Sequence, residues 1–306
     1  MATNRSMIQK SLVPGVHEIV GLSYGETPQE HKMLFDIMNS SRAFEEEVYV
    51  SGMGGAPTKT EGAAVMFDDI QETYTARYQA ETVAIGFAVT KEAFDDDLYD
   101  TISRAKGQEL GRSIADTKEV KGSAIFNRGF NSAYVGGDGV PLFSDAHPTS
   151  VGTFSNKLSV DLSESALEDA CITISKLTND RGILLALRPK MLVIPPELKF
   201  TAEKILRSEF STGQGIYGTD AKHVNDINAL KSTGLVGDVG VNHRLTDPAA
   251  WFLKTTAPNG TKMFIREPLS GDSEVDFITD NLLFKYRERY SFGWTDPRGW
   301  IGSEGA

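Results

Sequence analysis

Residues 48–89 restrict the fold more than any other part of the sequence. Val83, Ile85, Phe87 and Val89 alternate with small or polar residues, which predicts a β-strand that forms the return limb of a long hairpin. Between the limbs, the glycine-rich run 51–57 leads into residues 58–64, which offer almost nothing to pack. A hairpin of about 40 residues with so few large apolar side chains near its tip cannot build its own core. We therefore expect a partner to hold it and to cover its strand edges.

The negative charge of the chain lies mostly in and around this hairpin. The whole sequence has 31 Lys and Arg against 42 Asp and Glu, a formal net charge of −11. Residues 44–100 contain thirteen acidic residues and only three basic ones, Lys59, Arg77 and Lys91, which accounts for −10 of that total. Two interpretations stay open: a solvated acidic face, or a segment that lies against a basic partner or a basic patch of another copy.

Composition excludes several classes of protein. The chain is 40% hydrophobic and 24% charged, as in soluble proteins with a core, and its 306 residues suffice for about two domains. The net negative charge has the wrong sign for gripping phosphate backbones. No run approaches the ~18 apolar residues of a membrane span, and the N-terminus lacks the apolar core of a signal peptide. Cys171 is the single cysteine, so an intrachain disulfide is excluded and a reducing cytoplasm is indicated.

Residues 1–46 are predicted to form an N-terminal arm with one short helix. Thr27–Glu30 matches a capping box with proline at the first helical position. The helix after it would carry Met33, Leu34, Ile37 and Met38 on one face. The preceding 26 residues have no regular apolar periodicity, because it is interrupted at Pro14, Gly15, Gly21 and Gly25.

A long helix is predicted after the hairpin, ending near Phe126. If it is continuous from Asp96 it spans roughly 45 Å at 1.5 Å per residue, which is long for a compact enzyme domain. The acidic residues 95–97 would favour its N-terminal end. Its apolar stripe is Leu98, Ile102, Ala105, Leu110, Ile114 and Ala124.

The second half of the chain predicts short helices and strands of an α+β protein without βαβ alternation. A helix is expected at 163–177, where Cys171 on the apolar face is a small core residue and not a nucleophile. A strand at 191–194 is turned by Pro195-Pro196 into a helix that ends near Phe210, and a flexible loop, Ser211–Asp220, follows. Further strands are predicted at 236–241, 251–253, 263–266 and 282–294, with a turn at Pro258–Gly260 and a stop at Asp296–Gly299.

No motif indicates catalysis or a bound cofactor. Nucleophile-elbow, Walker and zinc-protease motifs are missing, and 52–55 and 136–139 are interpreted as glycine-rich turns. The acidic triplets 45–47 and 95–97 are interpreted as helix-end charge, because adjacent carboxylates on a helix point to different sides. We therefore expect a protein that is not an enzyme, with no catalytic, cofactor-binding or metal-binding residues and no cofactor. The histidines are scattered, without metal-ligand spacing: His17, His31, His147, His223 and His243.

Four segments, in order along the chain, carry a family resemblance. The first is GGDGVPLFSDAHP at 136–148; the others are RPKMLVIPPEL at 188–198, VNHRLTDPAAWFL at 241–253 and FKYRERYSFGWTDPRG at 284–299. The Gly62–Ala64 turn, the strand at 78–90 and the acidic helix start at 95–99 also fit. From about residue 28 to its end, the chain resembles the major capsid proteins of tailed phages, closest to the Mu-like major head subunits.

This resemblance implies an α+β fold of the Hong Kong 97 type. Its parts would be an N-terminal arm with a short helix (1–46), an extended β-hairpin loop (47–89), a peripheral domain with a long spine helix and C-terminal strands (90–187 and 262–306) and an axial domain (188–261). The missing core of the hairpin would then be a neighbouring subunit. Basic residues of that neighbour would receive the acidic charge, with Lys262, Arg266, Lys285, Arg287 and Arg289 as candidates.

The same resemblance implies a major capsid protein that self-assembles into hexamers and pentamers of an icosahedral shell. The shell would enclose double-stranded phage DNA without reading its sequence, in a virion assembled in the host cytoplasm, with no membrane involved. A separate scaffolding protein would be expected, because only about 26 residues precede the first predicted helix and they are too few for a scaffolding segment within the chain. A portal and a decoration protein would be further partners. A covalent cross-link through Lys59 is not expected. Two alternatives stay open: an encapsulin-like compartment shell, and an enzyme with an undetected site.

Overall fold

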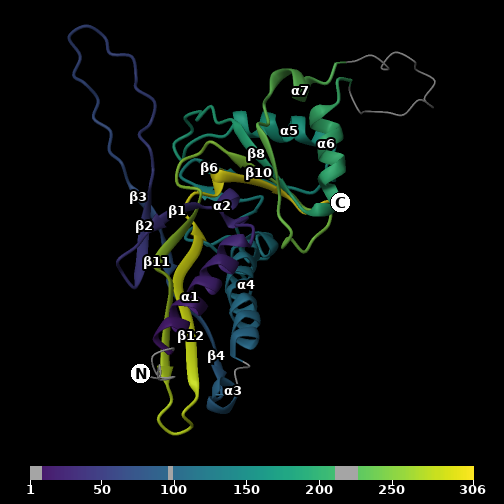
Figure 1. Cartoon of the computed structure of the whole chain (residues 1–306). Helices are drawn as coiled ribbons and strands as arrows, with labels where there is room; N and C mark the ends of the chain where they lie inside the picture. Colours follow the sequence, from purple (N-terminus) through teal and green to yellow (C-terminus); the bar gives the residue numbers. More distant parts are fainter. Residues whose placement is uncertain (1–8, 96–98, 211–226) are drawn as a thin grey trace. The chain divides into compact units, whose positions relative to one another are not determined.

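The computed structural model describes residues 9–95, 99–210 and 227–306 and divides the chain into two compact units (Figure 1). The first unit comprises Met1–Glu45, Tyr78–Gly122 and Met263–Phe292, and the second comprises Glu46–Arg77, Ser123–Lys262 and Gly293–Ala306. Each unit is therefore assembled from three separate stretches of sequence. The expected loop Ser211–Asp220, as well as Asp96, Asp97, Leu98 and His223, lies outside the described residues.

The first unit is a four-stranded sheet with two helices packed on it. The strand order is β1 (Asp36–Asn39), β11 (Thr261–Val275), β12 (Leu282–Trp294) and β4 (Glu81–Val89). β12 has the predicted bounds and runs antiparallel to β4, with Leu282 opposite Val89 and Tyr290 opposite Glu81. The core joins β4 and β12 to helices α1 (Gln9–Glu26) and α4 (Tyr99–Asn127), and its main members are Val16, Val20, Leu110, Ile114, Val89, Phe284 and Tyr286.

Helix α4 confirms the predicted long helix over its described part. Its 29 residues correspond to a length of about 43 Å at 1.5 Å per residue. Gly111 is required on its buried face, because a Cβ there would lie only 2.7 Å from the Val20 carbonyl oxygen of α1. A separate short helix, α3 (Lys91–Asp95), precedes the three residues before α4 that are not described.

The N-terminal prediction is wrong in two respects. Residues 9–26 form helix α1 and not an irregular arm, because Val16 and Val20 are buried in the core and the Ser23 hydroxyl donates to the Gln108 carbonyl at 2.7 Å. Tertiary packing therefore outweighs the poor helix propensity of the sequence. The predicted capping box does not form either: helix α2 covers only His31–Leu34, its N-cap makes no side-chain hydrogen bond, and Ile37 and Met38 lie in strand β1.

The core of the first unit contains charged groups that the apolar pattern did not reveal. Lys118 Nζ lies 2.5 Å from Glu288 Oε2, and both side chains are nearly buried. Burial, and secondly Glu288, raise the pKa of the Tyr24 hydroxyl, which donates to the same carboxylate. At the next residue of α4, the Glu119 carboxylate accepts from the backbone N–H of His31 at 2.7 Å and contacts its ring Nδ1 at 2.5 Å.

The second unit is built around a five-stranded sheet covered by short helices. The strand order is β7 (Lys157–Leu158), β13 (Trp300–Ser303), β10 (Trp251–Thr255), β8 (Pro189–Ile194) and β9 (Asp238–Val241). β8 and β9 are parallel neighbours, and the chain between them contains η2 (Pro196–Leu198), α6 (Lys199–Arg207) and α7 (Ala229–Thr233). This is a βαβ connection, so the expected absence of βαβ alternation is wrong at this place. Sequence analysis also missed β13.

Several local predictions for this unit are confirmed. Helix α5 (Glu164–Ser175) begins after Ser163, whose hydroxyl accepts from the backbone N–H of Ala166 at 3.1 Å. Cys171 on α5 is buried in the core, and burial raises the pKa of its thiol to about 11. Strands β8, β9 and β10 occur where strands were predicted at 191–194, 236–241 and 251–253. The predicted turn Pro258–Gly260 separates β10 from β11, with Asn259 in the left-handed region.

The hairpin exists, but its return limb is a different strand from the predicted one. Residues 81–89 form β4 of the four-stranded sheet, whereas the long hairpin consists of β2 (Phe44–Val50) and β3 (Glu72–Gln79), which form a sheet of their own. Residues 123–187, which the family resemblance groups with the long helix, belong to the same compact unit as residues 188–262. The assignment of peripheral and axial domains stays a prediction.

Candidate functional site

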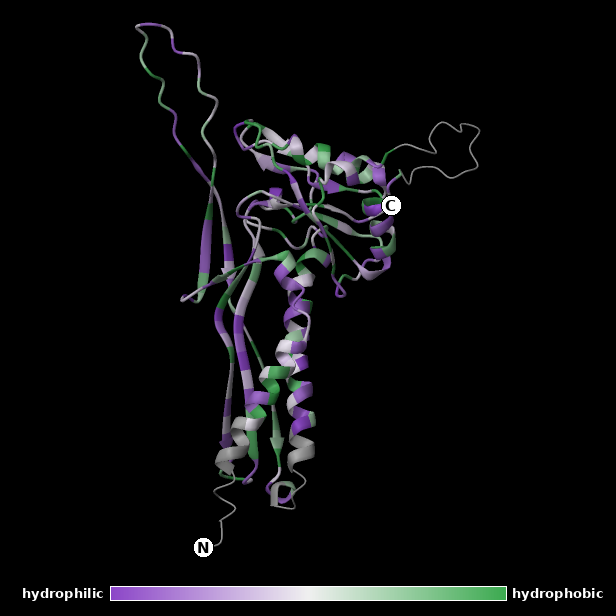
Figure 2. Cartoon of the chain, turned by 45° about the horizontal axis from the view of Figure 1, so that its top comes forward, coloured by the Kyte–Doolittle hydropathy of each residue, from purple (hydrophilic) through white to green (hydrophobic). Residues whose placement is uncertain are grey.

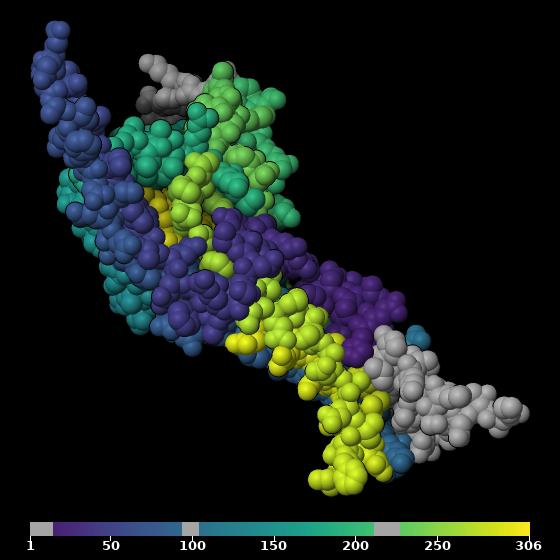
Figure 3. Space-filling view, turned by 90° about the vertical axis from the view of Figure 1, so that its left-hand side faces the viewer, coloured from purple at the N-terminus to yellow at the C-terminus, as the bar shows by residue number. Residues whose placement is uncertain are grey.

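The loop between β2 and β3 exposes apolar side chains and contains no helix or strand. Val65 and Met66 are 61% and 71% exposed, and Phe67 is 93% exposed. Figure 2 shows hydrophobic and hydrophilic stretches side by side along this loop, and Figure 3 shows its tip standing clear of the teal and green parts of the second unit. Contiguous exposed apolar side chains of this kind mark a surface that another molecule covers.

Two contacts close the neck of the loop. The backbone N–H of Ser51 donates to the Gln71 carbonyl at 2.8 Å, and the Gln71 N–H returns a bond to the Ser51 hydroxyl. Further out, Asp68 accepts from the Gly54 N–H at 2.7 Å and forms an ion pair with Arg181 at 3.1 Å. The N–H groups of Gly54 and Asp69 hold the pKa of Asp68 below its usual value.

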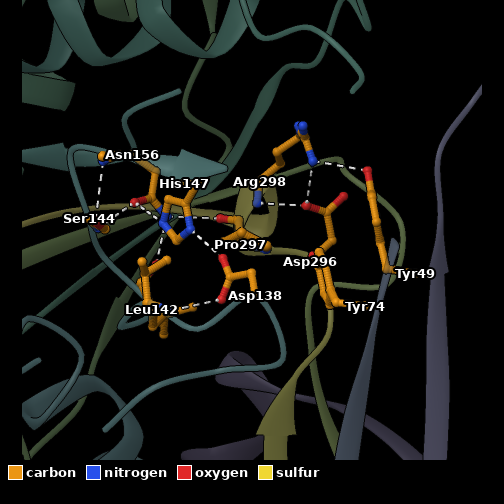
Figure 4. Close-up of polar contacts among 12 residues, drawn as sticks. Tyr49, Tyr74, Asp138, Leu142, Ser144, His147, Asn156, Asp296, Pro297 and Arg298 are labelled. Carbon is orange, nitrogen blue, oxygen red and sulfur yellow. Dashed lines mark hydrogen bonds and ion pairs between the residues drawn. The ribbon is translucent and has the colours of Figure 1, made fainter. Parts of the chain in front are cut away.

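A buried arginine fixes strand β2 below this neck. Arg298 lies in η4 (Pro297–Gly299), and its guanidinium contacts Asp180 at 2.6 Å and Asp296 at 3.3 Å. It also donates to the Tyr49 hydroxyl at 2.9 Å (Figure 4). A further hydrogen bond runs to the Thr178 carbonyl, also at 2.9 Å. Burial raises the pKa of Asp296, and the adjacent Arg298 opposes that rise. The guanidinium thus joins β2 to the body of the second unit through four different groups.

The same C-terminal segment holds both limbs of the hairpin. Tyr74 of β3 stacks on Tyr49 with ring centroids 5.0 Å apart, and its hydroxyl donates to the Thr295 carbonyl at 2.9 Å. Glu47 of β2 accepts from Lys262 at 2.6 Å and from the Thr295 hydroxyl at 2.6 Å. Because Glu47 and Tyr49 lie on the same face of β2, alternate residues of that strand are anchored one after the other.

The GGDGVPLFSDAHP segment (136–148) is linked through Asn156 to the C-terminal segment that carries Arg298. His147 contacts Asp138 through Nδ1 at 2.7 Å and the Asn156 Oδ1 through Nε2 at 3.0 Å (Figure 4). The amide of Asn156 donates in turn to the Leu142 and Pro297 carbonyls at 2.8 and 3.0 Å. Both ring nitrogens of His147 therefore have a hydrogen-bonding partner. His147 is therefore a buried structural group, and 136–139 form the predicted turn.

The acidic residues of β2 are neutralised largely within the chain. Arg42 approaches Glu45 at 3.9 Å, Arg77 approaches Glu46 at 3.8 Å, and Lys262 binds Glu47. The interpretation of 45–47 as helix-end charge is wrong, because these residues lie in a strand. Three of the candidate cations for a neighbour's hairpin have partners in their own chain, and they are Lys262 with Glu47, Lys285 with Asp272 and Arg287 with Glu267.

The other histidines are used structurally where their contacts are described. His17 contacts the Tyr286 hydroxyl at 2.7 Å, and His31 pairs with Glu119. Within residues 9–95, 99–210 and 227–306, no group of three or more His, Cys, Asp or Glu side chains is arranged to hold a metal ion. In the same described residues, no helix is long and apolar enough to cross a membrane.

Sequence reasoning missed the residues that anchor the hairpin. Asp296–Gly299 is predicted as the stop of a strand and as part of a segment that carries the family resemblance, with no role at the hairpin base, and neither Tyr49 nor Asp180 carries a local signal. The one usable signal was the alternation of Glu47 and Tyr49 with other residues along β2, which indicates that one face of that strand is covered.

A family model described as phage capsid protein matches residues 73–302. The chain belongs to the phage capsid protein family. As a phage capsid protein it is a structural component of a bacteriophage virion. The matched residues include β3 from Thr73 onward, the whole of α4 and the C-terminal segment that carries Arg298. No curated protein matches its sequence significantly.

Solved structures share the fold of this phage capsid protein at low sequence identity. The capsid of cyanophage P-SCSP1u is similar with a TM-score of 0.58 and 10% identity, over 89% of this chain and 86% of that chain. The capsid of a native GTA particle gives 0.54 and 12%, over 91% and 90%. A virus-like particle from Pyrococcus furiosus gives 0.51 and 11%, over 94% and 96%. At these identities the likeness shows the fold alone.

Proposed function

We propose that the chain is the major head subunit of a tailed phage, with a Hong Kong 97-type fold, of the Mu-like kind. Copies of it assemble into hexamers and pentamers of an icosahedral shell that encloses double-stranded DNA. The first unit corresponds to the peripheral domain with its spine helix α4, and the second unit contains the axial domain. The family match and the shared fold of phage capsids support this proposal.

The observation that carries the proposal is the contrast between the loop and its base. The base is held by buried ion pairs around Arg298, whereas Val65, Met66 and Phe67 at the outer part are exposed. A loop that is fixed in direction but exposes apolar side chains is suited to covering, or being covered by, a neighbouring subunit. Many such moderate contacts, repeated by symmetry, add up to a stable shell.

The remaining parts of the proposal concern partners and place of assembly. A separate scaffolding protein, a portal and a decoration protein act with the subunit, and assembly takes place in the host cytoplasm. The subunit has no catalytic role, because its buried polar groups hold segments of its own fold together. The net charge of −11 supports a wall that does not adhere to packed DNA.

Electron microscopy of the purified or scaffold-coexpressed protein tests the proposal. We expect closed shells or capsomers for the unaltered chain and a strong loss of shells for Phe67→Ser, which removes the most exposed apolar ring of the loop. Val151→Ser is the matched control, because Val151 is also exposed (68%) but lies outside the loop. A protein that stays monomeric under all assembly conditions would refute the proposal.

An encapsulin-like compartment shell is the second candidate, favoured by the likeness to the virus-like particle from Pyrococcus furiosus. Both candidates predict shells, so their contents decide between them. Particles isolated from the native source contain double-stranded DNA if the chain is a phage head subunit. They contain a defined cargo protein and no genome if it forms a compartment.

A further inference from the structure

Strand β4 has an open edge that lacks the usual protection. It is the last strand of its sheet, so one of its edges pairs with no strand in the part of the chain that the structure describes. No charged residue occurs from Thr82 to Val89, and the exposed residues of this stretch are Thr82, Ala84, Ile85, Gly86 and Ala88. Long, exposed edge strands without charge, proline or cover are ready to pair with another chain.

Two contacts show which backbone groups of β4 point away from β12. The Ala88 carbonyl accepts a hydrogen bond from Lys106 Nζ at 3.1 Å, so it faces outward. A Cβ on Gly86 would lie 3.3 Å from the Lys285 Cα, as in the close pairs of an antiparallel ladder that exchange no hydrogen bonds. Because hydrogen-bonding direction alternates along a strand, Thr82, Ala84 and Gly86 present their N–H and C=O groups at the open edge.

The extended loop offers a segment with matching properties. Val65, Met66 and Phe67 are exposed, lie in no helix or strand, and make no hydrogen bond within the described residues. Within the described residues, Asp69, which follows them, forms no ion pair. Lys106 of α4, which contacts β4 at Ala88, has no acidic partner within those residues either. The segment therefore carries unused backbone groups, apolar side chains and one charge that complements the end of the edge.

We propose that Ala64–Phe67 of a second copy adds to the open edge of β4 as a parallel strand, with its Asp69 beside Lys106. This inference rests on the proposed function and names the surface on which the loop docks. Backbone hydrogen bonds to Thr82, Ala84 and Gly86 provide the attraction, and the apolar side chains of the loop cover exposed Ile85. The parallel direction follows from the charges, because Asp69 follows the C-terminal end of the loop segment and Lys106 of α4 contacts Ala88 near the C-terminal end of β4.

Disulfide trapping between differently tagged copies tests the contact directly. The only native cysteine is buried, so introduced thiols report cleanly. Copies with Val65→Cys and copies with Ala84→Cys, mixed before assembly and oxidised, are expected to give a cross-linked heterodimer on a non-reducing gel. Val151→Cys replaces Val65→Cys in the control. A heterodimer yield no higher than that of the control overturns the proposal.

A proline at the edge provides the second test. Ala84→Pro removes an outward N–H but leaves the hydrogen bonds to β12, so the subunit is expected to unfold at the temperature of the unaltered chain yet form no shells. Ala84→Val keeps the N–H and is expected to assemble normally. Normal shells from Ala84→Pro refute the edge pairing and leave the proposed function intact, whereas failure of the unaltered chain to assemble refutes the proposed function. If Ala84→Pro fails to fold, the disulfide experiment alone decides.

Discussion

Truncation of Arg298 to alanine is the most informative perturbation of the hairpin base. The Arg298 side chain is 2% exposed, and its partners Asp180 and Asp296 are 3% and 8% exposed. Arg298→Ala leaves both carboxylates buried without their cation and removes the donor to the Tyr49 hydroxyl. The variant therefore breaks a buried ion pair by deleting one partner only, which is the costly way to lose such a pair.

The expected size of the effect follows from this burial. Removing one partner of a buried pair costs about 3–5 kcal/mol of unfolding free energy, whereas an exposed pair contributes ~0–1 kcal/mol. The chain provides a matched control in Arg181, whose guanidinium also pairs with a carboxylate, that of Asp68 at 3.1 Å, but with side chains about one-third exposed. With ~2–4 °C of melting temperature per kcal/mol for a unit of this size, Arg298→Ala should lower the melting temperature by roughly 6–20 °C. Arg181→Ala should lower it by at most about 4 °C.

Thermal and urea unfolding of unassembled subunits measure this difference. A second variant separates lost charge compensation from lost packing: Arg298→Met combined with Asp180→Asn and Asp296→Asn removes all three charges of this cluster and should recover part of the loss. Hydrogen exchange should quicken in β2 and β3 of Arg298→Ala, because Tyr49 loses its anchor. If Arg298→Ala and Arg181→Ala differ by less than about 1 kcal/mol, the buried network does not hold the hairpin, and the reasoning fails.

Three further predictions concern single positions. Gly299→Ala should destabilise the second unit by about 1–3 kcal/mol, because the new Cβ would lie 2.8 Å from the Gly260 Cα, while Gly55→Ala, which meets open space, should leave the unfolding midpoint unchanged. Burial raises the pKa of the Cys171 thiol to about 11, so at pH 8 iodoacetamide should modify the folded chain ~100-fold more slowly than the unfolded chain. The stability gained from the neutral thiol should fall as the pH rises above the pKa of the unfolded thiol. The pKa of Asp68 is lowered in the folded chain, so its bond to the Gly54 N–H should be fully formed above the ordinary carboxyl pKa and lost as the pH falls through the folded pKa. Hydrogen exchange at the Gly54 N–H should quicken as this bond is lost, and Asp68→Asn should remove this pH dependence.

Local signals explain the parts of the fold that the sequence predicted. Strand β12 alternates buried and more exposed residues from Leu282 to Tyr290, and its predicted bounds, 282–294, match the structure. Helix α5 has both an apolar stripe and Ser163 at its N-cap. The need of the hairpin for a partner was predicted because a long segment with few large apolar side chains near its tip cannot build its own core, which is a statement about composition and needs no knowledge of contacts.

The missed elements depend on contacts between distant parts of the chain. Helix α1 contains Pro14 and three glycines, and only the burial of Val16 and Val20 explains why it is helical. Strand β13 has four residues and no alternation of polar and apolar side chains; it is ordered by β10 on one side and β7 on the other. Tyr49 and Arg298 are 249 positions apart, so no periodicity or motif could have joined them. Their pairing is set by the fold and not by local sequence.

The base and the loop solve two different problems of assembly. Apolar side chains such as Phe67 supply attraction, but a loop free in direction would lose conformational entropy each time it docked, at about 1–2 kcal/mol per residue ordered. Buried ion pairs at the base contribute little net stability, because desolvation offsets their attraction. They do fix the direction of the strands, since a guanidinium with four fixed partners tolerates few other arrangements. The buried polar groups at the base therefore orient the loop before it docks. Loss of Arg298 should impair assembly even where the docking side chains are intact.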